Sequence, residues 1–369
     1  MRYSLLSQFQ GVLVGAAIGE LLGVCWATQV TPADPLNSTA PPLPLNCPEQ
    51  WSHLLTSAPV REKLSVSEPR WGRLVVLGAQ SLVRRGDLDF ADWQPRQPNP
   101  QGTADLGTLR ASLGESLGAS ELAIASLPIA LFFHEDEAKL YQNLERLSQE
   151  GVPKPSSILP SFMISLAIAQ ALQNQFHPQR SIPQMIAAIT RLETRLGRPV
   201  AEANSLAILM QQLAQVQTLL EQQASLERVR SQLCQSQQAL QATSTLHELQ
   251  AIMAALYCCL ATPNDWRLAV LRSLQMQIAP ALVATLTGAI SGAANSLAGI
   301  PVEWRLALDH PDSGSTLKSL WQVVEFEAEI MELGSALLAT WSGTYDTQKF
   351  PVKRYHVPAI AAPRVIRPR

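Results

Sequence analysis

The chain has 369 residues, of which 47% are hydrophobic and 16% charged, and its formal net charge is −2. This composition is typical of a globular protein whose large core belongs to one large domain or two average ones. The total charge gives no reason to expect binding to nucleic acid or to a membrane. Five cysteines without a Cys-x-x-Cys pair argue against a disulfide framework and against a zinc site, so we expect a cytoplasmic protein.

A long apolar helix is predicted at the N-terminus, where Gly11, Gly15, Gly19 and Gly23 recur every four residues and therefore share one face. A face without side chains favours close packing against a neighbouring backbone, and a ligand pressed against the glycines is the alternative. Glu20 interrupts the apolar run and no clean small-residue cleavage site follows, so we do not expect an export signal.

The central part of the chain is predicted to be helical after a Pro-rich loop at 31–60, whose first 18 residues contain six prolines. Apolar residues at helical spacing predict a helix from Trp71 to Gly86. Alternating strand patterns are almost absent, so the fold class is all-α. Further helices are indicated at 119–134, 137–149, 158–175, 182–195, 203–222, 225–260, 265–275, 280–297 and 316–342.

A Gln-rich region at 203–260 keeps apolar residues at spacings of three and four, with one slip near Gln222. Two arrangements fit this pattern. The region could form a hairpin of two antiparallel helices that turns near Ala224 and Ser225, or one long helix offered to a partner. The slip falls midway, and this position favours the hairpin.

The last third contains an uncharged segment and a basic tail. Ile278–Ile300 is rich in Ala, Gly, Ser and Thr, and Gly288 and Gly292 lie one turn apart, so a buried and closely packed helix is expected. The tail at 347–369 has no acidic residue. Usually such a segment is mobile; alternatively it binds an acidic partner or the acidic body of the chain. Its basic residues are Lys349, Lys353, Arg354, Arg364, Arg367 and Arg369.

Four segments resemble, in the family's own order, the ADP-ribosylglycohydrolases. Phe9–Gly23 is similar to the family's opening GxxxGxAxGDxxG, and Ile278–Ala293 with Gly299–Trp304 is similar to GGDxDTxAxxxGAxxGA and its Ile-Pro-x-x-Trp turn. Trp71–Gly86 matches the helix that the family begins with TDDT, and Gly118–Pro128 matches a segment resembling GAAMRVAPL. The resemblance implies one all-α domain over 1–346, with a cleft that holds two Mg²⁺ ions and cleaves ADP-ribose from an acceptor.

The positions that hold the two metal ions in the family carry other residues here. Magnesium needs carboxylate or hydroxyl oxygens in a near-octahedral array. Of the family's acidic set only Glu20 is retained, at the place of an Asp. We therefore expect no metal cofactor, although Arg70 could contact a phosphate in a bound ligand. The remaining positions of this vestigial cleft are Arg70, Trp71 and Gly72 at the TDDT motif and Ala279, Ala281 and Leu282 at the DxDT motif.

Three functions follow from this substitution pattern. The first is a catalytically inactive protein that binds a protein partner through the Gln-rich helices, the basic tail or the Pro-rich loop. The second is a module that binds ADP-ribose or another nucleotide without cleaving it. The third is an active hydrolase with an atypical metal site around Glu20.

Other catalytic patterns are weak. The histidines are scattered without a helical metal-site spacing, and the chain has no GxGxxG, GxxxxGK[ST] or GxSxG motif. The one local cluster of titratable residues, His134-Glu-Asp-Glu137, is interpreted as a helix cap, with a metal site as the alternative.

Overall fold

The computed structural model describes residues 3–29, 71–88, 119–151, 157–196, 203–239, 244–306, 321 and 326–343, and these contain helices and no strand. The all-α prediction is therefore confirmed for the described residues. The predictions for the Pro-rich loop, for Arg70 and for the basic tail lie outside them.

The helices are α1 Leu5–Gln29, α4 Trp71–Arg85, α6 Ala119–Ala125, α7 Leu127–Phe132, α8 Glu137–Gly151, α9 Ile158–Leu172, α10 Ser181–Leu196, α11 Ala203–Glu221, α12 Leu226–Ala239, α13 Ser244–Ala261, α14 Trp266–Gln275, α15 Pro280–Asn295, η3 Leu297–Gly299, α16 Val302–Leu306 and α18 Phe326–Trp341.

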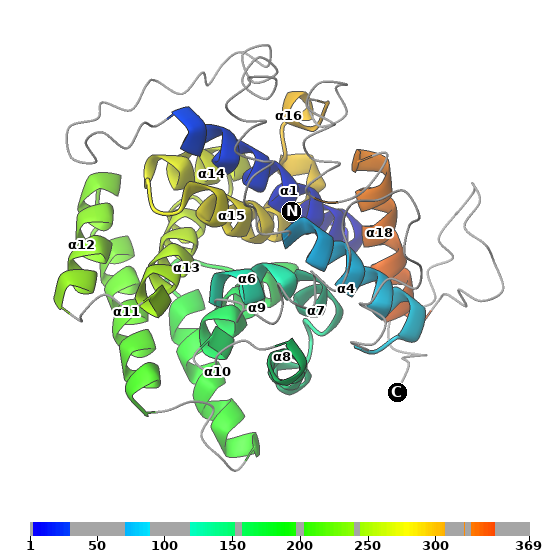
Figure 1. Cartoon of the computed structure of the whole chain (residues 1–369), viewed down its shortest axis with the longest axis horizontal. Helices are drawn as coiled ribbons and strands as arrows, with labels where there is room; N and C mark the ends of the chain where they lie inside the picture. The colour runs from blue at the N-terminus through cyan, green and yellow to red at the C-terminus, as the bar shows by residue number, and fades with distance from the viewer. Residues whose placement is uncertain are drawn as a thin grey trace.

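Helices α1 and α15 run antiparallel in direct backbone contact at the centre of the fold (Figure 1). A Cβ atom added to Gly11 would lie 2.5 Å from the carbonyl oxygen of Gly292, and one added to Gly23 would lie 2.5 Å from that of Pro280. Gly15 meets Gly288 in the same way between these two ends. The predicted close packing is confirmed, and the alternative of a ligand on the glycine face is wrong, because α15 occupies that face.

The remaining core helices surround this pair. Every residue of α9 is buried, which agrees with its apolar character on all sides. The Gln8 side chain ties three helices together, since its Nε2 donates to the carbonyl oxygens of Ala171 at 3.2 Å and Ala293 at 2.8 Å. Leu5–Ala27 is long and apolar enough to cross a membrane, but 94% of its apolar 18-residue window is buried inside the fold, as expected of a core helix.

Two predicted helices differ from the observed ones, and a third lies only partly within the described residues. The helix expected at 119–134 is divided into α6 and α7 at Ser126, because Pro128 has no N–H to continue the hydrogen-bond ladder. The helix expected at 225–260 is two helices, α12 and α13. For the helix expected at 316–342, the described residues give α18, which begins at Phe326, together with Trp321.

The Gln-rich region forms the predicted hairpin, not one long helix. After α11 the backbone of Gln223 takes a left-handed φ of 49°, and the Ala224 N–H donates to the Leu219 carbonyl at 3.0 Å. The hydroxyl of Tyr257 on α13 donates to the Ala224 carbonyl at 2.7 Å and so fixes the turn to the core. Helix α12 then lies beside α11 (Figure 1).

Candidate functional site

The described cleft positions lie on α1, α4 and α15. Glu20 is on α1, one residue after Gly19, whose added Cβ would lie 2.6 Å from the carbonyl carbon of Ala284 on α15. Gly23, one turn later, packs against Ala281. Trp71 and Gly72 are the first two residues of α4. The structure therefore brings the α1 and α15 positions to one end of the α1–α15 pair.

Trp321 lies between Glu20 on α1 and Gly72 on α4, and this contact was not predicted from the sequence. Its side chain is 0% exposed, and its indole Nε1 donates to the Glu20 Oε2 at 2.8 Å. A Cβ added to Gly72 would lie 2.5 Å from the Cδ2 of Trp321, so the indole rests directly on the Gly72 backbone. Glu20 itself is 1% exposed. A buried aromatic ring thus lies against two of the cleft positions.

The α15 positions offer no side-chain oxygen. Ala279 is exposed and precedes the helix with a left-handed φ of 37° and without a side-chain cap. Ala281 is half-buried, and its carbonyl accepts a hydrogen bond from the Thr285 hydroxyl at 2.6 Å. Leu282 is buried among core residues. At the start of α15 these three residues therefore present only methyl and isobutyl side chains.

The described residues do not fit a pair of magnesium ions. The cleft presents one carboxylate, Glu20, and this carboxylate already accepts the Trp321 indole N–H. Within the described ranges no three His, Cys, Asp or Glu side chains come together as a potential metal site. Two octahedral ions need several carboxylate or hydroxyl ligands, and the positions that would supply them in the family carry Ala281, Leu282, Trp71 and Gly72.

Two buried indole N–H groups near the same end of the fold have no acceptor. The Nε1 atoms of Trp26, near the C-terminus of α1, and of Trp71, at the start of α4, are both buried without a hydrogen-bond partner. A buried donor without a partner is unfavourable. Each of them could donate to an oxygen of a bound ligand.

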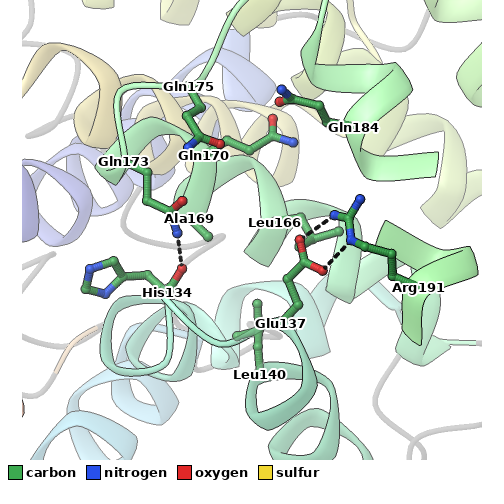
Figure 2. A pocket seen from close by; sticks show the side chains of 10 residues that line it. All are labelled: His134, Glu137, Leu140, Leu166, Ala169, Gln170, Gln173, Gln175, Gln184 and Arg191. Carbon is green, nitrogen blue, oxygen red and sulfur yellow. Dashed lines mark hydrogen bonds and ion pairs between the residues drawn. The ribbon is translucent and has the colours of Figure 1, made fainter. Parts of the chain in front are cut away.

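The His134–Glu137 cluster caps a helix, as predicted. The Asp136 side chain accepts hydrogen bonds from the N–H groups of Ala138 at 3.0 Å and Lys139 at 3.2 Å, at the start of α8. The Glu137 carboxylate is paired with the Arg191 guanidinium at 2.7 Å (Figure 2). This cap and this ion pair account for the Asp136 and Glu137 carboxylates without a metal.

His134 faces the core instead of joining these carboxylates. Its Nδ1 lies 2.7 Å from the Leu131 carbonyl oxygen. Its ring packs edge-on against Phe9 and obliquely against Trp341, at centroid distances of 5.8 and 5.0 Å. The imidazole therefore has a structural position in an aromatic cluster.

One protein family matches most of the chain. The sequence model of the ADP-ribosylglycohydrolase family matches residues 1–339. This range contains α1, α4 and α15, which carry the cleft positions, and Trp321. No curated protein matches the chain.

Proposed function

Because the chain belongs to the ADP-ribosylglycohydrolase family, we propose that it is a catalytically inactive member that acts in the cytoplasm by binding a protein partner. The observation that carries the proposal is the buried Trp321 indole, which lies on Gly72 and donates a hydrogen bond to Glu20. An aromatic side chain thus lies against two of the positions at which the resemblance implies metal ligands.

The chemistry of the site supports inactivity in two independent ways. Lack of ligands is the first, since Ala279, Ala281 and Leu282 cannot hold a hard cation. Lack of space is the second, because a hydrated ion and a sugar phosphate cannot share the volume that Trp321 fills. An active site needs both, and rearrangement of the indole alone would restore only the space.

Exposed apolar side chains support binding to a protein. Val302 and Leu306 lie one turn apart on α16 and are 59% and 66% exposed. Leu268 on α14 is 44% exposed. Large exposed aliphatic groups are common at protein interfaces. We further propose that the tail at 347–369 contributes, because its six Lys and Arg residues without any acid suit an acidic partner.

Catalysis is tested by incubating the purified protein with ADP-ribosylated protein and Mg²⁺, with an active family enzyme as the positive control. We expect no release of ADP-ribose from this chain. Release of ADP-ribose that is abolished by Glu20→Gln would overturn the proposal, because it would show that the one retained carboxylate takes part in catalysis.

The partner is tested by cross-linking in cells, followed by reconstitution with the purified candidate. We expect the full chain to bind more tightly than a chain that ends at residue 346. A variant in which the six basic tail residues are Gln should bind as weakly as the shortened chain. Equal affinity of all three proteins would remove the tail from the proposal, and failure of every reconstituted pair would overturn the binding function.

Non-hydrolytic binding of ADP-ribose is the second candidate, and the unpartnered indole N–H groups of Trp26 and Trp71 favour it. A ligand at 100 times its dissociation constant stabilises the folded state by about 2.7 kcal/mol. A rise in the melting temperature with ADP-ribose, lost in Trp71→Phe, would support this candidate. An unchanged melting temperature would leave protein binding alone.

A further inference from the structure

A pocket lies between α8, α9 and α10, away from the cleft positions. Its volume is about 180 Å³, smaller than the roughly 300–1,000 Å³ that hold drug-sized ligands. It lies near the C-terminal end of α9, where Gln8 joins Ala171 to Ala293. Ala293 is 11 residues after Leu282 on α15, roughly 17 Å along the helix axis. The pocket is therefore a separate site.

The pocket holds a buried carboxamide oxygen that lacks a donor. Gln170 on α9 is 9% exposed, and its Nε2 donates to the Ser181 carbonyl at 3.3 Å. Because a backbone carbonyl only accepts hydrogen bonds, this contact fixes which end of the carboxamide is the oxygen. The Gln170 Oε1 is buried without a partner, and Figure 2 shows the carboxamide pointing into the space in front of Gln184.

Gln184 on α10 repeats this arrangement from the facing wall. Its Oε1 is also buried without a hydrogen-bond partner, and its carboxamide points toward that of Gln170 (Figure 2). Gln173 and Gln175 add two exposed carboxamides at the rim. Neither buried oxygen has a hydrogen-bond donor among the described residues, and a molecule with donor groups within the pocket would supply one.

The other walls determine the charge and shape of such a molecule. Glu137 and Arg191 form a bidentate ion pair at the pocket edge, with distances of 2.7 and 3.3 Å, so together they add no net charge. Leu140, Leu166 and Ala169 give an aliphatic side. A cation or an anion gains little in a pocket without net charge, whereas a neutral molecule with hydroxyl groups and an apolar face matches both surfaces.

We propose that this pocket binds a small neutral polyol, in the size range from glycerol to a monosaccharide. Hydroxyl groups donate to the Oε1 atoms of Gln170 and Gln184 and accept from the amide groups of the rim glutamines. The C–H face of the polyol packs against Leu140 and Leu166. This function does not depend on activity or inactivity of the Glu20 cleft.

The test is ligand-observed saturation-transfer NMR on the full chain, with glycerol, D-glucose and myo-inositol as separate probes. We expect saturation transfer to at least one probe, and about tenfold weaker binding in Gln170→Leu and in Gln184→Leu, as expected for loss of one buried hydrogen bond. Methylammonium and acetate should give no transfer.

Gln212→Leu is the matched control, because Gln212 on α11 is also buried, at 4% exposure, and its Oε1 also lacks a partner, but it does not line the pocket. It should bind the probe as the wild-type chain does. Gln170→Leu removes the donor to the Ser181 carbonyl and could fail to fold. Because Gln184 is only half-buried, the binding measured with Gln184→Leu then decides whether the proposal holds. No transfer to any polyol, equal binding in Gln184→Leu, or a crystal soaked in polyol with water alone in the pocket would each overturn the proposal.

Discussion

The contact between α1 and α15 gives the sharpest prediction, for the substitution Gly11→Ala. The new Cβ would lie 2.5 Å from the Gly292 carbonyl oxygen, which is 0.9 Å inside the 3.4 Å at which ordinary contact begins. It would also lie 2.7 and 2.8 Å from backbone atoms of Ser296 and Leu297. No side-chain rotation relieves contacts with backbone atoms, so the two helices must move apart.

The expected magnitude follows from two opposing effects. Overpacking of a core costs about 1–3 kcal/mol and occasionally more, and Ala gains about 1 kcal/mol over Gly in a helix. Because the same separation disturbs the contacts of Gly15, Gly19 and Gly23, the overpacking cost should lie at or above the top of its range. We expect Gly11→Ala to lower the free energy of unfolding by about 2 kcal/mol or more.

Gly334→Ala on α18 is the matched control. Gly334 is also buried within a helix, but its added Cβ would meet Gln10 at 3.3 Å, close to ordinary contact. This variant should be neutral or more stable by up to about 1 kcal/mol. The assay is urea unfolding followed by far-UV circular dichroism. An unfolding midpoint of Gly11→Ala equal to or above that of the wild type would refute the reasoning.

Four further predictions concern single contacts. Trp321→Phe should cost about 1–3 kcal/mol in urea unfolding, because Glu20 loses one buried donor. Asp265→Ala should cost about 1 kcal/mol, since Asp265 caps α14 by accepting from the Leu268 N–H at 2.8 Å. Burial raises the pKa of the Cys258 thiol from 9.0 to about 12. The contribution of this thiol to the free energy of unfolding is therefore complete below pH 9 and is lost as the pH rises from 9 toward 12, at roughly 1 kcal/mol per pH unit. Cys258→Ala should lack this part of the pH dependence of urea unfolding. Ala281→Asp should bind no Mg²⁺ in calorimetry, because one added carboxylate leaves the Trp321 indole in place.

Helix packing could be predicted from the sequence because its signal is periodic. The four glycines of α1 share one face, and Gly288 and Gly292 give α15 a complementary one. Close packing of each face was predicted from this spacing, but the pairing of α1 with α15 was not predicted. The hairpin turn at Ala224 was similarly indicated by a local slip in spacing.

The Trp321 contact could not be predicted because it joins residues 301 positions apart. A single tryptophan has no periodic pattern, and nothing local indicates which cavity it fills. The pocket around Gln170 could not be predicted either, because nothing in the sequence distinguishes Gln170 from the many other glutamines. The division of 225–260 into α12 and α13 was missed for a different reason, since apolar spacing continues across the break.

Burial of Trp321 beside Glu20 has a physical reason in the residues around it. A cleft with several carboxylates stays hydrated, because its charges need water or cations. Here Trp321 is buried and rests on the backbone of Gly72, and such burial of an aromatic ring is favourable. The Glu20 carboxylate beside it is also buried and needs a donor in this dry environment. An indole supplies apolar surface and one N–H together, which phenylalanine or leucine could not, and so a tryptophan fits a position beside one buried acid.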